Sequence, residues 1–413
     1  MARVTHILLH LIFHTTRGQT TVQLGFIHRV TSGGSFLGNF WDGVSCAGLM
    51  AIKHANARDA TIVSEFASLQ KTYTAVSTDS GTSEAGTIAA YRSCVAAGVK
   101  GIVGPALSRT NVIAGYVGGL DQIVNMGYWT SSPTLTDSVT FPYLATRSYH
   151  SDTVRASKLI ETFNLFNLTN FGIINTDDAW ANAFVSLIRL AAEEPGSGVN
   201  VINSFNFAYG NAEAVRTAVR RLHQLTTPVN VIFTLTFDND LEVLCDEAAN
   251  RGLFSSEYVW IEAQGLSTQP LAAAQNASVV GPRINGWLQI ASILPASNYA
   301  KYESAWAGMT AADCNNPVFT PSPSLFGGPP VDVGSYEYDA AAAMILALDS
   351  LTVAQESDGD VVRAAVGALD FQGASGRMKF EASLDRDVTT ADISLFNLTL
   401  PRKIAILIAI HAI

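Results

Sequence analysis

The sequence predicts an α/β fold of two doubly wound lobes with mostly parallel sheets, and three observations support this. Its 413 residues are too many for one compact core and fit about two domains of ~100–200 residues each. Hydrophobic residues make up 48% of the chain and charged residues only 15%, which allows large buried cores and argues against disorder. Short apolar runs alternate with helical patterns, as they do where helices connect parallel strands.

A first series of alternating elements lies in the first third of the chain. The run 22–30 (VQLGFIHRV) is apolar and strand-like, whereas the apolar residues of 43–57 fall on one face of a helix. The other predicted strands are 72–76, 101–103 and 123–129, and the other predicted helices are 84–97 and 109–121.

The alternation then restarts, which predicts a second α/β half. Its predicted strands are 171–175, 199–207, 229–236 and 258–262, and its predicted helices are 151–166, 179–194, 212–225 and 238–251. A loop rich in Pro, Ser and Gly at 315–330 (NNPVFTPSPSLFGGPP) precedes the clearest helical pattern of the chain, 338–351 (YDAAAAMILALDSL).

Charge and cysteine usage exclude several classes of protein. The net charge is −10 and no run of Lys or Arg occurs, which argues against nucleic acids and anionic membrane surfaces as partners. The spacing of the four cysteines includes no CxxC, so zinc ribbons and thioredoxin-type redox chemistry lack support. One or two disulfides and four buried thiols remain equally compatible with Cys46, Cys94, Cys245 and Cys314.

Both ends of the chain are interpreted as targeting or anchoring segments. Residues 1–20 contain the apolar run ILLHLIF and are a candidate signal peptide. Three histidines there share helical i, i+4 spacing, and we assign them to this leader rather than to a metal site. Residues 401–413 are basic and then apolar, and this run is too short to cross a bilayer, which takes ~20 residues. We interpret them as a juxtamembrane or truncated tail, with a final strand as the alternative.

Three Asn-x-Ser/Thr sequons are compatible with secretion and with glycosylation. They begin at Asn167, Asn276 and Asn397. Since a chain rich in Asn, Ser and Thr contains a few such triplets by chance, they do not establish secretion.

Polar and aromatic residues gather in the turns that follow the predicted strands, where sheets of this kind bind ligands. Small hydroxyls and helix N-terminal N–H groups suit a carboxylate or another anion, and aromatic rings suit an apolar body or a cationic head group. Taken singly, Ser108 fits a helix N-cap, Ser131 a turn and Trp180 a packing residue. Their placement on successive strand ends favours a binding site.

Six ordered segments between about residues 22 and 398 resemble one known family. Residues 101–108 (GIVGPALS) match a GxxGPxxS strand and turn, and 128–137 (YWTSSPTLTD) match a YxSTSPxLSD segment. The others are 141–153 (FPYLATRSYHSDT), 244–260 (LCDEAANRGLFSSEYVW), 338–340 (YDA) and 371–380 (FQGASGRMKF). Together they resemble the receptor family ligand-binding region, a type I periplasmic-binding-protein-like module. The segment that ends in Tyr-Val-Trp is similar to GABA-B and other class C receptor ectodomains.

The resemblance implies a Venus-flytrap arrangement, with two lobes joined by a three-stranded hinge. Residues 22–147 and 290–370 would form lobe 1, and residues 148–289 and 371–400 would form lobe 2. This division explains why the second α/β half is followed by more chain than it needs.

The resemblance also implies ligand contacts at matching positions. Ser108 stands where the family binds the ligand carboxylate, Ser131 where it has a second hydroxyl, and Trp129 where a small residue offers its backbone. Trp180 and Phe237 would bring rings from lobe 2. The remaining candidates are Thr130 in the same turn as Ser131, Tyr149 at a crossover, Trp41 (or its neighbour Phe40) in the first turn, and Gln264.

Two departures from the family pattern put an α-amino-acid ligand in doubt. Amino-acid receptors have an acid where this chain has Gln264, and an amide does not neutralise an ammonium group. The alternative sources of negative charge are Glu262, Asp177, Asp178 and Asp332. Trp129 is bulky where the family is small, which predicts an altered or reduced pocket.

The predicted function is that of an extracellular ligand-binding domain of a transmembrane receptor, which signals by lobe closure. Its partners would be a small polar ligand (amino-acid-like or carboxylate), a second copy bound through lobe 1, and the membrane, through a segment at or outside the C-terminal end. A soluble binding protein of an amino-acid transporter and a ligand-free dimerisation subunit are the alternatives. The G-x-S-x-G, P-loop, GxGxxG, HExxH and kinase signatures are missing, so we expect no enzyme, cofactor or metal site. The expected location is the extracellular side of the plasma membrane, or secreted.

Overall fold

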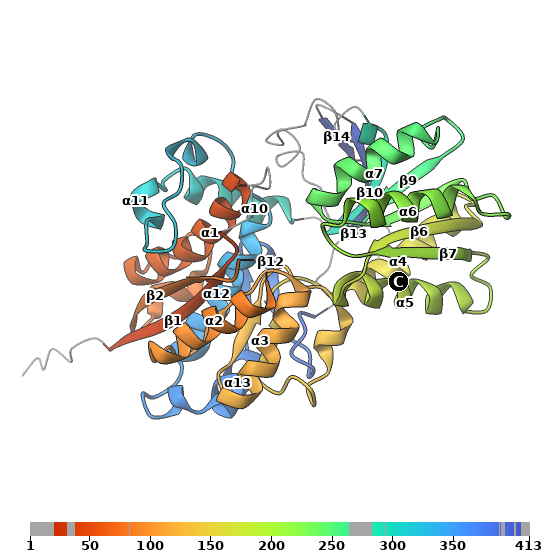
Figure 1. The fold of residues 1–413 in the computed structure, drawn as a ribbon. Helices are drawn as coiled ribbons and strands as arrows, with labels where there is room; N and C mark the ends of the chain where they lie inside the picture. The colour runs from red at the N-terminus through yellow and green to blue at the C-terminus, as the bar shows by residue number, and fades with distance from the viewer. Residues whose placement is uncertain are drawn as a thin grey trace, which may run out of the picture.

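The computed structural model describes residues 20–30, 38–81, 83–263, 283–292, 294–387, 389, 393–399 and 402–405. Two α/β lobes lie side by side, and the amino-terminal elements share one lobe with α12 and α13 from late in the sequence (Figure 1). Each lobe has a sheet flanked by helices, which confirms the predicted fold class.

The first lobe is built on a parallel five-stranded sheet of order β2-β1-β3-β4-β5. Its strands are β1 (Thr21–His28), β2 (Thr72–Asp79), β3 (Ile102–Val103), β4 (Asn125–Gly127) and β5 (Leu144–Arg147). The strands alternate with helices as predicted, although β3 and β4 are shorter than the apolar runs around them. All five carboxyl ends therefore face one edge of the sheet, where a ligand site is expected.

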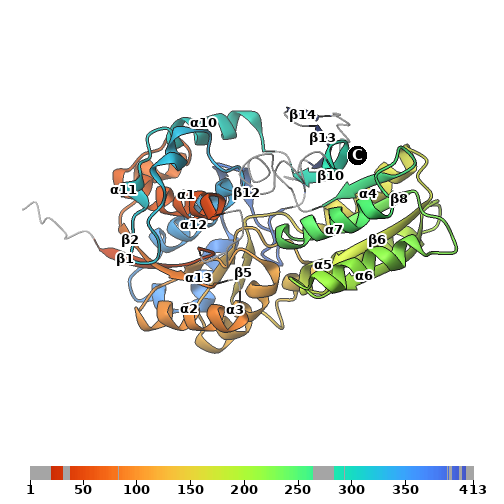
Figure 2. The ribbon, with the colours of Figure 1, turned by 45° about the horizontal axis from the view of Figure 1, so that its top comes forward.

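The α-helices described in this lobe flank the sheet, with α1 and α12 packed together and α2 packed against α3 (Figure 2). They are α1 (Gly38–Ala57), α2 (Glu84–Ala96), α3 (Ser108–Asp121), α10 (Ala296–Trp306), α11 (Ala311–Cys314), α12 (Gly334–Asp349) and α13 (Gly359–Gly367). Nearly every side chain of α12 is buried, including the carboxylates of Glu337 and Asp339 near its start. Gly48 of α1 lets the two helices approach, because a Cβ there would lie 2.8 Å from a Glu337 oxygen.

The second lobe has a seven-stranded sheet of order β14-β13-β10-β9-β8-β6-β7. Strands β6 to β10 are parallel, and β13 and β14 add an antiparallel edge. The strands are β6 (Asn170–Thr176), β7 (Asn200–Phe207), β8 (Val231–Leu235), β9 (Val259–Glu262), β10 (Trp287–Ser292), β13 (Ile393–Thr399) and β14 (Arg402–Ala405). The helices are α4 (Asp152–Leu165), α5 (Ala179–Glu193), α6 (Ala212–His223) and α7 (Asp238–Asn250).

The two ends of the chain are described only in part. Residues 1–19 of the candidate signal peptide lie outside the described residues, and within 401–413 only β14 is described. Among the helices that the structure describes, none has the length and apolar character needed to cross a bilayer.

Two buried arginines tie the first crossover between the lobes to the third. Arg147, at the end of β5, donates from Nε to the Asp385 carboxylate at 2.8 Å. Arg386 donates from Nη1 to the carbonyl oxygen of Ser148 at 2.7 Å. Since both guanidinium groups are at most 1% exposed, these contacts fix the place where the lobes meet.

A short hairpin, β11 (Asp370–Gly373) and β12 (Gly376–Lys379), leads into the third crossover. The predicted division at residue 371 assigns it to lobe 2, but Asp339 of α12 holds it from the first lobe. The Asp339 carboxylate accepts from the backbone N–H of Ala374 at 2.6 Å and from that of Ser375 at 2.8 Å. The hairpin thus belongs with α12 until the chain reaches Arg386.

Two of the four cysteines form a disulfide, and the other two are free thiols. Cys46 of α1 and Cys314 of α11 form a disulfide with a Cα–Cα distance of 5.2 Å. Cys94 and Cys245 are buried thiols, one in each lobe. Burial raises the pKa of both thiols, to about 11 for Cys94 and about 12 for Cys245, so neither is poised to react.

Candidate ligand site between the lobes

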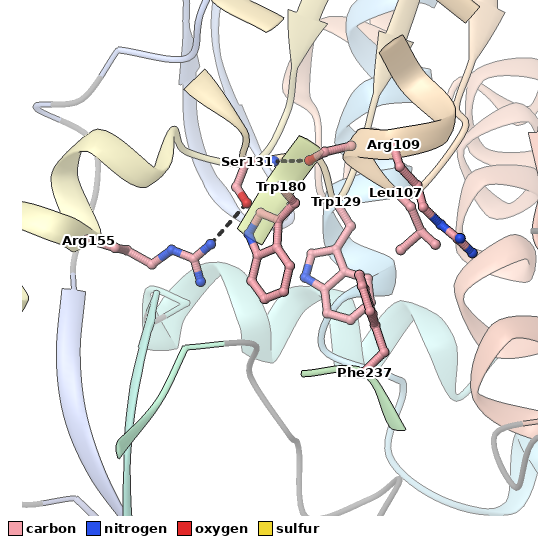
Figure 3. A pocket seen from close by; sticks show the side chains of 8 residues that line it. Leu107, Arg109, Trp129, Ser131, Arg155, Trp180 and Phe237 are labelled. Atoms are coloured by element: carbon pink, nitrogen blue, oxygen red, sulfur yellow. Dashed lines mark hydrogen bonds between the residues drawn. The ribbon is translucent and has the colours of Figure 1, made fainter. Parts of the chain in front are cut away.

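A pocket with about 360 Å³ of empty volume lies where strand ends of the two sheets face each other (Figure 3). The turns after β3 and β4 line it from the first lobe, with Leu107, Ser108, Arg109, Trp129 and Ser131. The second lobe contributes Arg155 from α4, Trp180 from the start of α5, and Phe237 from the turn after β8. Because both lobes line it, the pocket can exist in this form only while they are close together.

Ser108 fixes the first-lobe wall of the pocket. It is the first residue of α3, and its Oγ accepts hydrogen bonds from the backbone N–H groups of Ser131 and Ser132, both at 3.2 Å. These two bonds use the lone pairs of the hydroxyl and leave its proton for an acceptor. Ser108 therefore holds the turn after β4 in place and can still donate to a ligand.

Trp129 presents a half-buried ring to the pocket, supported from behind by other aromatic residues. Its ring centroid lies 5.4 Å from that of Trp41 and 6.2 Å from that of Phe40. Trp41 is 1% exposed and does not line the pocket, and the Arg29 guanidinium lies 4.3 Å from its ring centroid. The two rings in the first helix thus set the position of Trp129.

Trp180 and Phe237 form the aromatic wall of the second lobe, with ring centroids 5.4 Å apart. Trp180 is oriented by the N-terminus of α5, where Asp178 accepts from the backbone N–H groups of Trp180 at 2.8 Å and Ala181 at 3.0 Å. Burial raises the pKa of Asp178, while these hydrogen bonds act in the opposite direction. The Asp178 carboxylate is therefore engaged in capping and is not among the residues that line the pocket.

Arg155 is a site residue that the sequence did not reveal. It is 3% exposed, and its Nη2 donates to the Ser131 hydroxyl at 3.0 Å, across the boundary between the lobes. It also bonds the Asp152 carboxylate and the carbonyl oxygen of Ala263. Burial raises the pKa of Asp152 and the Arg155 charge opposes that shift. The sequence signal that could have identified Arg155 is its position three residues after Asp152 in a helix that begins at a crossover.

Arg109 is the second charged residue of the pocket, and it too was missed. Its guanidinium carbon lies 4.6 Å from the ring centroid of Tyr209, in the loop after β7 of the second lobe. Figure 3 shows Arg109 and Arg155 on opposite sides of the three pocket rings. The sequence signal that could have identified Arg109 is its position directly after Ser108 in the predicted turn.

The other predicted contacts lie around the pocket without lining it. Thr130 is fully buried behind the turn, and Tyr149 packs edge-on against Tyr336 with ring centroids 4.7 Å apart. The Arg155 guanidinium carbon lies 5.4 Å from the centroid of the Tyr149 ring, so Tyr149 packs against a pocket residue and does not line the pocket itself. Gln264 lies outside the described residues.

None of the four acids considered as a source of negative charge lines the pocket described here. Glu262 is 3% exposed and accepts from Gln289 Nε2 at 2.7 Å. Asp177 is exposed and accepts from Asn182 at 2.8 Å, and the main chain of Asp332 accepts from Ser335 at the start of α12. With Asp178 engaged as a helix cap, the charge that faces the pocket is positive.

The three sequons lie in different settings. Asn167 is exposed in the turn between α4 and β6, with a φ of 55° in the left-handed region. Asn397 lies within β13, where it pairs with Leu288 on one side and Ile404 on the other. Asn276 lies outside the described residues. Of the two described positions, the exposed turn at Asn167 is the more accessible to a modifying enzyme.

The two lobes, their crossovers and the pocket between strand ends define a type I periplasmic-binding-protein-like module. The sequence matches the family described as "Receptor family ligand binding region" over residues 44–399, and the chain belongs to that family. It is also similar to "Metabotropic glutamate receptor-like protein E" of Dictyostelium discoideum, with 21% identity over 316 residues. That match covers 73% of this chain and 35% of the relative, so the chain spans about a third of the relative's length. The family predicted from the six segments is confirmed.

Proposed function

We propose that this chain is the extracellular ligand-binding domain of a transmembrane receptor and that closure of its lobes on a small molecule is the signal. The observation that carries the proposal is the pocket, whose lining is divided between the two lobes. A ligand that touches both walls stabilises the closed arrangement and so shifts an open–closed equilibrium. The name of the Dictyostelium relative supports a receptor role.

The contacts across the lobe boundary suggest how closure works. Ser132 Oγ donates to the Ala179 carbonyl oxygen at 3.0 Å, and the Asp152 N–H donates to the Ser131 carbonyl oxygen at 2.9 Å. Both contacts involve the turn that Ser108 holds. A ligand bound first by the Ser108 hydroxyl would stiffen this turn and favour the second-lobe contacts, after which Trp180 and Phe237 cover it.

A ligand screen combined with a distance measurement tests this proposal. Thermal-shift assays with amino acids, amines and carboxylates would identify a stabilising compound. Spin labels at Ala89→Cys on α2 and Ser186→Cys on α5, both exposed positions in different lobes, would report the distance between the lobes. The two free native cysteines are buried and compete poorly for label.

We expect a stabilising compound to shift the distance distribution and to be recovered unchanged in mass. A compound that stabilises the protein without altering the distribution would contradict signalling by closure. If no compound in the screen stabilises the protein, the ligand-free dimerisation subunit becomes the better interpretation, since the protein's own rings already occupy much of the cleft.

We further infer that binding is not followed by chemistry. His150 lies at the first crossover, and burial holds its pKa well below the ordinary value, with Arg386, Arg155 and Arg147 contributing. A neutral, enclosed imidazole among three arginines has no access to a substrate in the pocket. A binding role without a catalytic step is consistent with this arrangement.

The proposed extracellular location and dimerisation have their own support. The Cys46–Cys314 disulfide fits an oxidising compartment. On the first lobe, α2 and α3 expose Ile88 (43%), Tyr116 (53%) and Leu120 (77%), which suits contact with a second copy. We assign this face to the dimer because the three exposed apolar side chains come from two helices that pack side by side.

A further inference from the structure

We propose that the ligand of the pocket between the lobes is an aromatic carboxylate that carries no ammonium group. The inference rests on the proposed function, because it names the ligand class of the same site. It goes further in one respect: the amino-acid ligand of the related receptors is replaced by an anion with a flat apolar body.

The charge of the pocket lining is the first observation. Both charged residues that line it are arginines, one from each lobe. Arg155 is 3% exposed, and its Nε has no hydrogen-bond partner among the residues that the structure describes. The Ser108 hydroxyl and the Arg155 Nε are therefore donors for a carboxylate, and the Arg109 guanidinium adds positive charge on the other side of the rings.

The carboxylates near the pocket are the second observation, because each is already engaged. Asp152 pairs with Arg155, and Asp178 caps α5 while accepting from the Thr176 hydroxyl at 2.8 Å. An ammonium group placed in this pocket would lose its water and find no acid in the described lining to pair with it. The site therefore discriminates against amines and against zwitterionic amino acids.

The rings of the pocket are the third observation. Trp129 faces Trp180 and Phe237 from the opposite lobe, so a flat ligand between the lobes meets aromatic surface on both sides. Because these rings lie close together in the closed arrangement, a flat ligand would enter while the lobes are apart and be covered as they close.

Two matched series of compounds test the inference by isothermal titration calorimetry on the full chain. Each series keeps the ring and changes the charged groups: phenylacetate, phenylalanine and phenethylamine, then indole-3-acetate, tryptophan and tryptamine. We expect a carboxylate from at least one series to bind, its amino acid to bind at least about tenfold more weakly, and its amine not to bind.

Two variants locate the binding. Arg109→Gln removes a half-buried charge and Trp180→Leu removes a ring, and each is expected to weaken carboxylate binding by at least about tenfold. Arg92→Gln, on the exposed side of α2, is the matched control and should bind like the wild type. We avoid substituting Arg155, because that would leave Asp152 buried without its partner.

Three results would overturn the inference: amino acids or amines that bind as well as the carboxylates, carboxylate binding that both variants leave unchanged, or no binding in either series. The proposed function fails on a different result, the absence of any compound that changes the distance between the spin labels. An amino acid that closes the lobes would thus contradict the proposed ligand class, an aromatic carboxylate without an ammonium group, but would support the proposed receptor function.

Discussion

At the scale of single residues, Ser108 holds the turn after β4 and is not the helix N-cap that its sequence position suggested. It begins α3, its Oγ accepts from the backbone N–H groups of Ser131 and Ser132, and the residue lines the pocket. A serine chosen as a ligand contact is thus also a structural residue. Loss of ligand binding in a Ser108 variant is therefore not by itself evidence of a direct contact.

Ser108→Ala is expected to lower the free energy of unfolding by about 1–3 kcal/mol. The substitution leaves two backbone donors without an acceptor in a turn where Ser131 and Ser132 are at most 4% exposed. Urea unfolding in the absence of ligand measures the effect, with the exposed Ser93→Ala on α2 as the control. Equal stability of the two variants would mean that the hydroxyl is not needed to hold the turn.

The sequence revealed the hydroxyls and rings of the site better than its charges. The predicted contacts Ser108, Trp129, Ser131, Trp180 and Phe237 all line the pocket, because each follows a strand whose carboxyl end faces the cleft. Arg109 and Arg155 were not named. Their place depends on how the lobes meet, and this packing is not encoded in any local pattern.

At the scale of elements, alternation identified the strands and helices that succeed one another within a lobe. It did not identify β10 and β13, which pair with each other across about a hundred residues, whereas β14 lies in the tail for which a final strand was the alternative interpretation. After β10 the chain leaves the second lobe, forms α10 to α13 in the first lobe, and then returns. The last strands are therefore not part of a regular alternation of strand and helix. The lobe to which the β11–β12 hairpin belongs also depends on a contact distant in sequence, because Asp339 fixes the hairpin to α12.

The face formed by α2 and α3 leads to a prediction about assembly. The double variant Ile88→Glu with Leu120→Glu is expected to convert a dimer to a monomer, since it places two charges on each copy of an apolar interface. Light scattering after size exclusion gives the mass. Leu190→Glu on the second lobe, a residue of similar exposure at 62%, should leave the dimer intact. A wild-type protein that is monomeric at tens of micromolar would contradict the assignment.

At the scale of the whole molecule, buried charges hold together parts of the chain that are far apart in sequence. Asp339 of α12 fixes the hairpin, Arg386 on the third crossover bonds Ser148 on the first, and Arg147 reaches Asp385. If these three hydrogen bonds persist when one lobe rotates against the other, the crossover segments must bend instead. The strength of the two bonds that Asp339 and Asp385 accept depends on the ionisation of these carboxylates.

Asp339 provides the pH dependence of this hinge region. Burial raises its pKa from 3.8 to about 6, although Arg386 and the hydrogen bonds from Ala374 and Ser375 act to lower it. Between about pH 4 and pH 6 the folded protein keeps a proton on Asp339 that the unfolded chain has lost. Stability therefore falls as the pH rises through this window, by an amount on the order of 3 kcal/mol for this group alone.

Comparison with Asp339→Asn isolates that contribution, because the amide cannot titrate. From pH 4 to pH 7 the wild type should lose more free energy of unfolding than the variant, so that the difference between them changes by about 3 kcal/mol. Urea unfolding at four pH values measures both curves. Asp370→Asn, at an exposed ion pair with Arg377, is the control in which the pKa of the native carboxyl is lowered instead. A difference between wild type and Asp339→Asn that stays constant with pH would show that Asp339 is ionised throughout, and that the Arg386 charge and the backbone donors outweigh its burial.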